Sequence, residues 1–286
     1  MNFVVGAKGR LGRVIVNTPS FQAIALNRPV YANWWRTGSA DAVSRFFERY
    51  SNEEQEARVI YVCAGILDPS LAMDEHHQIN FLLAKHIVEG ASKLGWRVLT
   101  FGTIMEKVIG LDTSNPYILT KTKLSEFIRE YSIKTRNTPP LHIRLHTLYG
   151  AGLPSPFMFL GQVLDAIAKQ ISFEMSSGNQ LREYHHINDE LKAISTLVAA
   201  KINGIIELNH GNPLTLKEIA TYLFKEFNCL ELLKIGSAST PLKENYDLVF
   251  ERPPLLSQLT FRETLPGLVN YLHLCKENHG ELLCLN

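Results

Sequence analysis

The sequence has no long apolar run: no stretch reaches the roughly 18 apolar residues that a membrane-spanning helix needs. It also has no excess of either charge, since 29 basic and 28 acidic side chains leave a net charge of +1. This balance gives no reason to expect nucleic acid or a membrane as the main partner. Residues 3–5 already form a strand-like run, so no signal peptide is visible.

Cysteine is scarce, and the four residues lie far apart with no metal-ligand spacing: Cys63, Cys229, Cys275 and Cys284. We expect reduced thiols in a cytoplasmic protein rather than a disulfide framework. The chain does have length: it contains 286 residues, of which 45% are hydrophobic. A chain of this size and composition can bury a substantial core.

Apolar runs alternate with helical patterns through the first half, which indicates parallel strands joined by crossover helices. Strands are expected at 3–5, 22–26, 58–63, 97–101 and 141–145. Helices are expected from Leu11 to before Pro19, from an N-cap at Ser39 through Phe46 and Tyr50, over 71–94 and over 117–133. The pattern predicts an α/β fold with a doubly wound parallel sheet of Rossmann type, which binds ligands at the carboxyl ends of its strands.

The pattern loosens in the second half, where helical segments alternate with short strands such as 205–208. Thr215 and Glu218 have the spacing of a capping box that opens a helix. We therefore expect a dinucleotide-binding domain at 1–150. A smaller α/β lobe at 151–286 would bind the substrate and close over the carboxyl edge of the sheet, with some chain returning to the sheet.

The run from Gly6 to Gly12 has the spacing Gly-x-x-Gly-x-x-Gly, with Gly9 in its middle, and it joins a strand to a helix. Glycines there allow a tight turn, close approach of a phosphate and close packing of the helix. The helix amino terminus then offers N–H groups to a pyrophosphate. We expect Arg10 and Leu11 to bind the cofactor with the glycines; the alternative is a glycine-rich turn without a ligand.

The end of the second strand indicates which dinucleotide binds. A carboxylate there suits the 2′-hydroxyl of NAD, whereas a cation suits the 2′-phosphate of NADP. This chain has Asn27 and Arg28 there with no acid nearby, and Lys8 and Arg10 add positive charge. NADP(H) is therefore favoured over NAD(H), unless Arg28 is only a solvated surface residue.

Tyr117 and Lys121 lie four residues apart on one face of an expected helix. A nearby ammonium stabilises tyrosinate and lowers the pKa of the phenol, which can then exchange a proton with a carbonyl oxygen. Thr103, at the end of a strand, could hydrogen-bond the same carbonyl. Each residue is commonplace by itself, and the glycine run upstream is what favours a catalytic role.

Further landmarks follow in order along the chain: Cys63-Ala64-Gly65, Asn80, Pro116 before Tyr117, RLHTLYG at 144–150 and REYHHIND at 182–189. In this order they resemble the extended short-chain dehydrogenase/reductases, especially the nucleotide-sugar epimerases and reductases. The resemblance implies an NAD(P)-dependent enzyme that acts on a nucleotide-diphospho-sugar, in surface polysaccharide biosynthesis. It also implies a homodimer that packs through two helices, one of them carrying Tyr117.

The resemblance also implies residue roles: Ala64, Gly65 and Asn80 would bind the cofactor, and Thr147 the substrate. Arg182 would reach the diphosphate, since a guanidinium suits two phosphate oxygens; the alternative is a salt bridge between lobe and sheet. His185 and His186 point to opposite sides of a strand, and no third ligand is evident, so no metal site is expected.

Three departures from the family pattern matter. Ile104 and Met105 stand where sugar 4,6-dehydratases resemble one another in having an Asp-Glu pair, the stretch from Thr103 to Tyr117 is short, and the first helix is short. The leading hypothesis is therefore an NADPH-dependent reductase of a 4-keto nucleotide-sugar. A 4-epimerase is the alternative, and a non-catalytic NADP(H)-binding regulatory protein is the alternative of another class.

Overall fold

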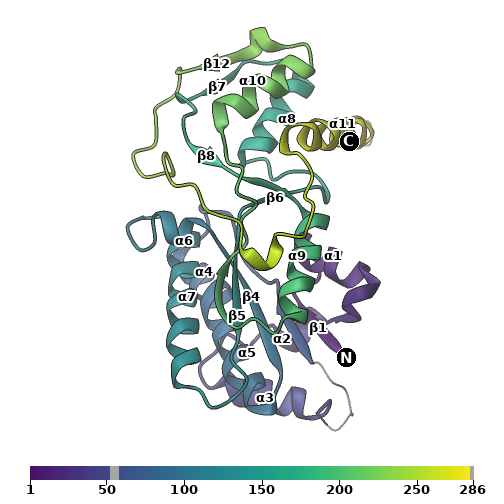
Figure 1. The fold of residues 1–286 in the computed structure, drawn as a ribbon, viewed down its shortest axis with the longest axis vertical. Helices are drawn as coiled ribbons and strands as arrows, with labels where there is room; N and C mark the ends of the chain where they lie inside the picture. Colours follow the sequence, from purple (N-terminus) through teal and green to yellow (C-terminus); the bar gives the residue numbers. More distant parts are fainter. Residues whose placement is uncertain (52–57, 284–286) are drawn as a thin grey trace. The chain divides into compact units, whose positions relative to one another are not determined.

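The computed structural model describes residues 1–51 and 58–283 (Figure 1), so Cys284 lies outside it. Cys63, Cys229 and Cys275 are not joined in disulfides. Within the described ranges no helix combines the length and the apolar character needed to cross a bilayer. The chain folds into two compact units, Met1–Leu145 with Ala193–Leu208 and His146–Lys192 with Asn209–Asn286.

The first unit is built on a six-stranded parallel sheet with the strand order β10-β5-β4-β3-β1-β2. The strands are β1 (Asn2–Val5), β2 (Ala23–Ala25), β3 (Val59–Val62), β4 (Arg97–Thr103), β5 (Leu141–Leu145) and β10 (Gly204–Glu207). β3 reads as an unbroken apolar run because both of its faces are buried. The predicted Rossmann-type α/β fold is confirmed, and the strand expected at 205–208 joins this sheet beside β5.

Helices cover both faces of this sheet (Figure 1). They are α1 (Arg10–Asn17), α2 (Arg28–Tyr31), α3 (Ser39–Glu48), α4 (Met73–His76), a π-helical segment (His77–Leu82), α5 (Leu83–Ala91), α6 (Met105–Val108), α7 (Pro116–Lys134) and α9 (Ile187–Ala199). Phe47 of α3, Ile87 of α5 and Ile128 of α7 pack on Phe3 and Val62 of the sheet in one core. Short 3₁₀ turns lie at Pro19–Phe21 and Ser92–Leu94 in this unit and at Leu230–Leu232 and Pro254–Leu256 in the second unit.

Two helix predictions in this unit are wrong in detail. Ser39 does not cap α3: Gly38 takes the cap position with φ 77°, and the Ser39 hydroxyl donates to the Asn33 carbonyl. The helix expected over 71–94 begins at Met73 and changes to π geometry over His77–Leu82. Such π segments are rare and frequent at functional sites.

The described part of the second unit contains three short strand pairs, three complete helices and the first turns of α9. Its strands are β6 (Thr147–Tyr149), β7 (Phe173–Met175), β8 (Leu181–Arg182), β9 (Tyr184–His186), β11 (Leu214–Thr215) and β12 (Leu233–Ile235), paired β6 with β9, β7 with β12 and β8 with β11. Its further helices are α8 (Phe159–Lys169), α10 (Leu216–Glu226) and α11 (Thr264–Leu283). Ile167, Phe224 and Leu272 bring α8, α10 and α11 into one core. The predicted capping box of Thr215 and Glu218 opens α10.

Candidate active site

The glycine loop lies between β1 and α1, and Gly6 and Gly12 each have a steric reason to be glycine. Gly6 has φ 86°, and a Cβ there would lie 2.4 Å from the backbone nitrogen of Ala64. A Cβ on Gly12 would lie 2.5 Å from the Gly6 carbonyl oxygen, which itself accepts a 3.0 Å hydrogen bond from the Gly9 nitrogen. Gly9 then caps α1 without a side chain, so the first N–H groups of the helix can face a phosphate.

The cations expected to select NADP lie around this loop. The Leu26 nitrogen donates to the Val4 carbonyl, which places the chain after β2 beside the end of β1. Arg28 follows as the first residue of α2 and is exposed, as is Lys8, while Arg10 is half-buried at the start of α1. The loop therefore has room and free N–H groups for the phosphates of a dinucleotide, and the preference for NADP stays a prediction.

Asn80 ties the loop after β3 to α4 and α7. It accepts from the Ile66 nitrogen at 2.8 Å, and its amide faces the Ile66 carbonyl, the Thr120 hydroxyl and His76 Nδ1 at 3.0 to 3.2 Å. A Cβ on Gly65 would lie 3.3 Å from this amide oxygen and 3.6 Å from Lys121 Nζ. Asn80 thus positions the predicted cofactor loop at Ala64 and Gly65 next to Lys121.

Lys121 is buried, and its ammonium donates a 2.7 Å hydrogen bond to the Phe101 carbonyl in β4. Burial lowers the pKa of Lys121 to about 8, although the charges of Glu106 and Cys63 act in the opposite direction. Lys121 therefore lies against the sheet. Tyr117 precedes it by one helical turn, at the start of α7. Asn115 caps α7 and accepts from the Tyr117 nitrogen at 3.0 Å.

The direction of the Tyr117 pKa differs from the sequence expectation. Burial raises the pKa of Tyr117, and the negative charge of Glu106 raises it further. The expected lowering by the Lys121 ammonium is thus wrong for this structure, in which burial and a neighbouring carboxylate dominate. The phenol is consequently protonated at neutral pH.

Thr103 ends β4 and starts the turn into α6. Its hydroxyl accepts a 3.3 Å hydrogen bond from the Met105 nitrogen, so its own proton can point to another acceptor. Its backbone nitrogen donates to Glu106 Oε1 at 2.8 Å. Sequence reasoning missed Glu106, because its partners come from β5, whose alignment with β4 no local pattern shows.

In the second unit, Arg182 pairs with a carboxylate that sequence reasoning missed. Its guanidinium donates to Glu244 and, at 2.8 Å, to the Leu181 carbonyl. Thr147 lies in β6 opposite Tyr184, and its nitrogen donates to the Glu183 carbonyl at 3.2 Å. Both predicted substrate residues thus belong to this unit, and Arg182 makes its salt bridge there.

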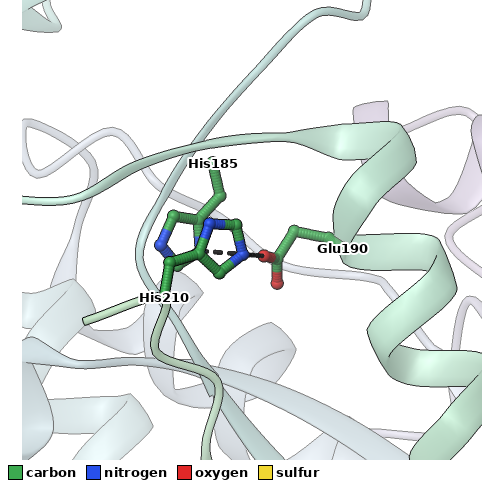
Figure 2. A group of neighbouring side chains, drawn as sticks. All are labelled: His185, Glu190 and His210. Atoms are coloured by element: carbon green, nitrogen blue, oxygen red, sulfur yellow. Dashed lines mark hydrogen bonds and ion pairs between the residues drawn. The ribbon is translucent and has the colours of Figure 1, made fainter. Parts of the chain in front are cut away.

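The two adjacent histidines do face opposite sides of β9, but His185 has partners that sequence reasoning missed. Figure 2 shows its ring stacked on that of His210, with the carboxylate of Glu190 from α9 directed at both. Their ligand atoms all lie within 4.8 Å of one another. Glu183 accepts from the other His185 nitrogen at 2.8 Å and from the His210 backbone nitrogen at 2.7 Å. We call Glu183, His185, Glu190 and His210 the histidine–glutamate cluster.

The ring geometry of this cluster disfavours a shared metal ion. The His185 and His210 rings are 3.5 Å apart between centroids and 7° from parallel. A metal lies close to the plane of each imidazole that binds it, and two stacked planes cannot both contain one ion. Burial lowers the pKa of His185, but Glu190 and Glu183 outweigh it and raise the pKa to about 9. The two carboxylates on either side of His185 therefore favour its charged imidazolium form.

The family model described as the NAD dependent epimerase/dehydratase family matches residues 3–208. The chain belongs to this family. The resemblance to extended short-chain dehydrogenase/reductases is thereby confirmed, as is the prediction of an NAD(P)-dependent enzyme. No curated protein matches the chain in sequence.

Solved structures of this family are similar to the chain over nearly their whole length. They include the dTDP-glucose 4,6-dehydratase DesIV from Streptomyces venezuelae with NAD and TYD bound, at 17% identity and TM-score 0.74, covering 98% of each chain. The UDP-glucuronic acid 4-epimerase from Bacillus cereus with UDP-glucuronic acid and NAD has 14% identity and TM-score 0.73, covering 97% of this chain and 99% of that one. The dTDP-4-dehydrorhamnose reductase from Bacillus anthracis with NADP has 15% identity and TM-score 0.71, covering 95% and 98%. At these identities the likeness shows the fold.

Proposed function

We propose that the protein is an NADPH-dependent reductase of a 4-keto nucleotide-diphospho-sugar. The observation that carries the proposal is that Lys121 contacts β4 at the Phe101 carbonyl, close to Thr103 at the end of that strand, while Tyr117 precedes Lys121 by one helical turn and has a protonated phenol. A reduction needs such a donor, because the carbonyl oxygen takes up a proton as its carbon receives hydride.

Each residue has a part in this reaction. Tyr117 donates its proton to the carbonyl oxygen, and the Thr103 hydroxyl donates a hydrogen bond to the same atom. Lys121 stabilises the tyrosinate that results and hydrogen-bonds the nicotinamide ribose. NADPH, held at the glycine loop, would supply the hydride, and Lys8, Arg10 and Arg28 favour its extra phosphate.

The substrate is proposed to lie with its diphosphate at Arg182. A guanidinium carries several N–H donors, so the bond to Glu244 leaves others for phosphate oxygens. The similarity to a UDP-glucuronic acid 4-epimerase and to a dTDP-4-dehydrorhamnose reductase supports this substrate class. A homodimer, a cytoplasmic location and a role in surface polysaccharide synthesis are part of the same proposal.

A 4-epimerase is the second candidate, supported by the similarity to the UDP-glucuronic acid 4-epimerase. It would use the same three residues but keep its cofactor and return the hydride after the sugar turns. Asn27 and Arg28 after β2 weigh against it, as the acid that binds NAD is missing there. A dehydratase is disfavoured by Ile104 and Met105, neither of which can transfer a proton.

The test is turnover of purified protein with NADPH and a 4-keto nucleotide-sugar, after a thermal-shift screen of UDP-, GDP-, CDP- and dTDP-sugars. We expect NADPH to be consumed in proportion to product. Tyr117→Phe should abolish turnover and leave NADPH binding intact. Turnover of an unoxidised nucleotide-sugar without added NADPH would overturn the reductase in favour of the epimerase, and full turnover by Tyr117→Phe would remove Tyr117 from the mechanism.

A further inference from the structure

Glu106 is a buried carboxylate in the first turn after Thr103, and its side chain is inaccessible to solvent. Its Oε1 accepts from the Thr103 nitrogen at 2.8 Å, and its Oε2 accepts from Arg144 Nε at 3.0 Å. His142 Nε2 lies 3.2 and 3.3 Å from the two oxygens. Glu106 therefore joins the turn that carries Thr103 to the neighbouring strand β5.

Gly102 makes room for this carboxylate. A Cβ at Gly102 would lie 1.9 Å from Glu106 Oε1 and 2.3 Å from His142 Nε2, and real Cβ atoms show no such distances. A glycine inside a strand commonly marks such a close approach. The backbone before Thr103 is thus shaped to take the Glu106 side chain underneath it.

Glu106 stays ionised in this position. Burial alone would raise its pKa, but His142, the Thr103 nitrogen and Arg144 stabilise the carboxylate and lower its pKa overall. Arg144 is held in turn by Glu207 at 3.0 Å and by the Ser125 hydroxyl at 3.2 Å, so the cluster is braced against β10 and α7. A negative charge is therefore fixed under the turn.

The same charge acts on the proposed proton donor and its lysine. Glu106 contacts β4 at the Thr103 nitrogen, and Lys121 contacts the same strand two residues earlier at the Phe101 carbonyl. The carboxylate acts to raise the pKa of both Tyr117 and Lys121, although burial keeps the pKa of Lys121 low overall. Charged and titratable groups face this region from every neighbouring element: Glu106 from α6, Cys63 after β3, His142 and Arg144 from β5 and Glu207 from β10. Among them Glu106 is the carboxylate that influences both residues of the pair.

We propose that Glu106 is a positioning residue of the reduction: it fixes Thr103 for the substrate carbonyl and keeps a permanent negative charge beside the Tyr117–Lys121 pair. The proposal rests on the proposed reductase function and deepens it. Such a charge disfavours tyrosinate and favours the ammonium. It therefore keeps the phenol protonated and the lysine charged to higher pH, and it also makes the phenol a weaker acid.

The test compares Glu106→Gln with Glu207→Gln, its matched control. Gln at 106 keeps an acceptor for the Thr103 nitrogen but removes the charge, whereas Gln at 207 removes a charge from the same Arg144 away from Thr103. We expect Glu106→Gln to move the alkaline limb of the kcat/KM profile about one pH unit lower, and Glu207→Gln to leave it in place. An unmoved limb in folded Glu106→Gln would overturn the electrostatic role.

A second variant separates position from charge and covers the case in which Glu106→Gln does not fold. Glu106→Asp keeps the charge but withdraws the acceptor from the Thr103 nitrogen by one methylene. We expect kcat to fall about ten-fold, with little change in KM or in the alkaline limb. Wild-type kcat in folded Glu106→Asp would overturn the positioning role.

A measurement without the sugar keeps the inference distinct from the proposed function. Tyrosinate absorbance, titrated in the NADP⁺ complex and corrected with Tyr117→Phe, should appear about one pH unit lower in Glu106→Gln than in the wild type. If this shift occurs and no ketone is reduced, the reductase proposal fails and the electrostatic role of Glu106 stands. An unshifted titration contradicts that role whatever the substrate is.

Discussion

Each unit of the molecule buries carboxylates beside histidine, but the two clusters balance their charge differently. In the first unit Glu106 pairs with Arg144, and arginine is the side chain that proteins effectively never deprotonate. In the second unit Glu183 and Glu190 pair with His185, whose charge is lost as pH rises. A fixed charge suits the place next to a proton donor, whereas the second arrangement couples the stability of its unit to pH.

The largest effect should follow from breaking the second cluster with His185→Phe. Phe can still stack on His210, but Glu183 and Glu190 would lose the cation between them. Removing one partner of a buried ion pair costs about 3–5 kcal/mol, and we expect a loss of this size in the unfolding free energy of the second unit.

The sequence lets the two units be followed separately in this experiment. The tryptophans are Trp34, Trp35 and Trp96, all in the first unit, so their fluorescence reports that unit while far-UV circular dichroism reports both. His186→Phe, on the opposite side of β9, is the control and should change stability by less than about 1 kcal/mol. A His185→Phe variant as stable as this control would contradict the role given to the cluster.

The pH dependence should separate the units next. His185 has its folded pKa raised from 6.5 to about 9, so its contribution is complete below pH 6.5 and is lost as pH rises through 9. Burial lowers the pKa of His146 to about 4, so the folded unit favours the neutral imidazole. The stability of this unit is therefore lost as pH falls from 6.5 toward 4. The second unit should be most stable near pH 6.5 and lose on the order of 3 kcal/mol by pH 9.

In the first unit Lys121 should act in the opposite way between about pH 8 and 9; above this range the raised pKa of Cys63 acts against it. Burial lowers the pKa of Lys121 to about 8, so the unfolded chain binds more protons than the folded one between this pH and the ordinary lysine range. Lys121 therefore adds stability to this unit as pH rises. Denaturant titrations at several pH values, read by tryptophan fluorescence and circular dichroism, measure the pH dependence of each unit. The loss of stability of the second unit at alkaline pH should vanish in His185→Phe.

A smaller effect is expected from overfilling the first cluster with Gly102→Ala. The added methyl would occupy the place of the Glu106 carboxylate, and overpacking of this kind costs about 1–3 kcal/mol. The double variant Gly102→Ala with Glu106→Asp shortens the acid and should recover part of the loss, as measured by tryptophan fluorescence in denaturant. Purely additive losses would show that the two positions do not compete for the same space.

The sequence predicted the features that depend on local spacing. The glycine loop and the helix with Tyr117 and Lys121 follow from short motifs and apolar periodicity, which the structure confirms as elements of a parallel sheet fold. The Thr215 capping box was predictable for the same reason, since a cap and its partner lie three residues apart.

The sequence could not predict the features that depend on register or on burial. Glu106 meets His142 and Arg144 only because β4 and β5 pair in one particular alignment. His210 reaches His185 from a loop that follows another strand. The direction of the Tyr117 pKa is set by desolvation, which a spacing of four residues does not reveal.

The smallest expected effect compares two helix caps, one in each unit. Asn115 caps α7 by accepting from the Tyr117 and Ile118 nitrogens, and Thr215 caps α10 by accepting from the Glu218 nitrogen. Replacing either with Ala should cost about 1 kcal/mol of unfolding free energy. Only Asn115→Ala should also lower kcat, because that cap fixes the turn that carries the proposed proton donor, whereas α10 carries no proposed catalytic group. Equal kcat in Asn115→Ala and Thr215→Ala, at equal stability, would show that the start of α7 is held by packing alone and that the cap does not orient Tyr117.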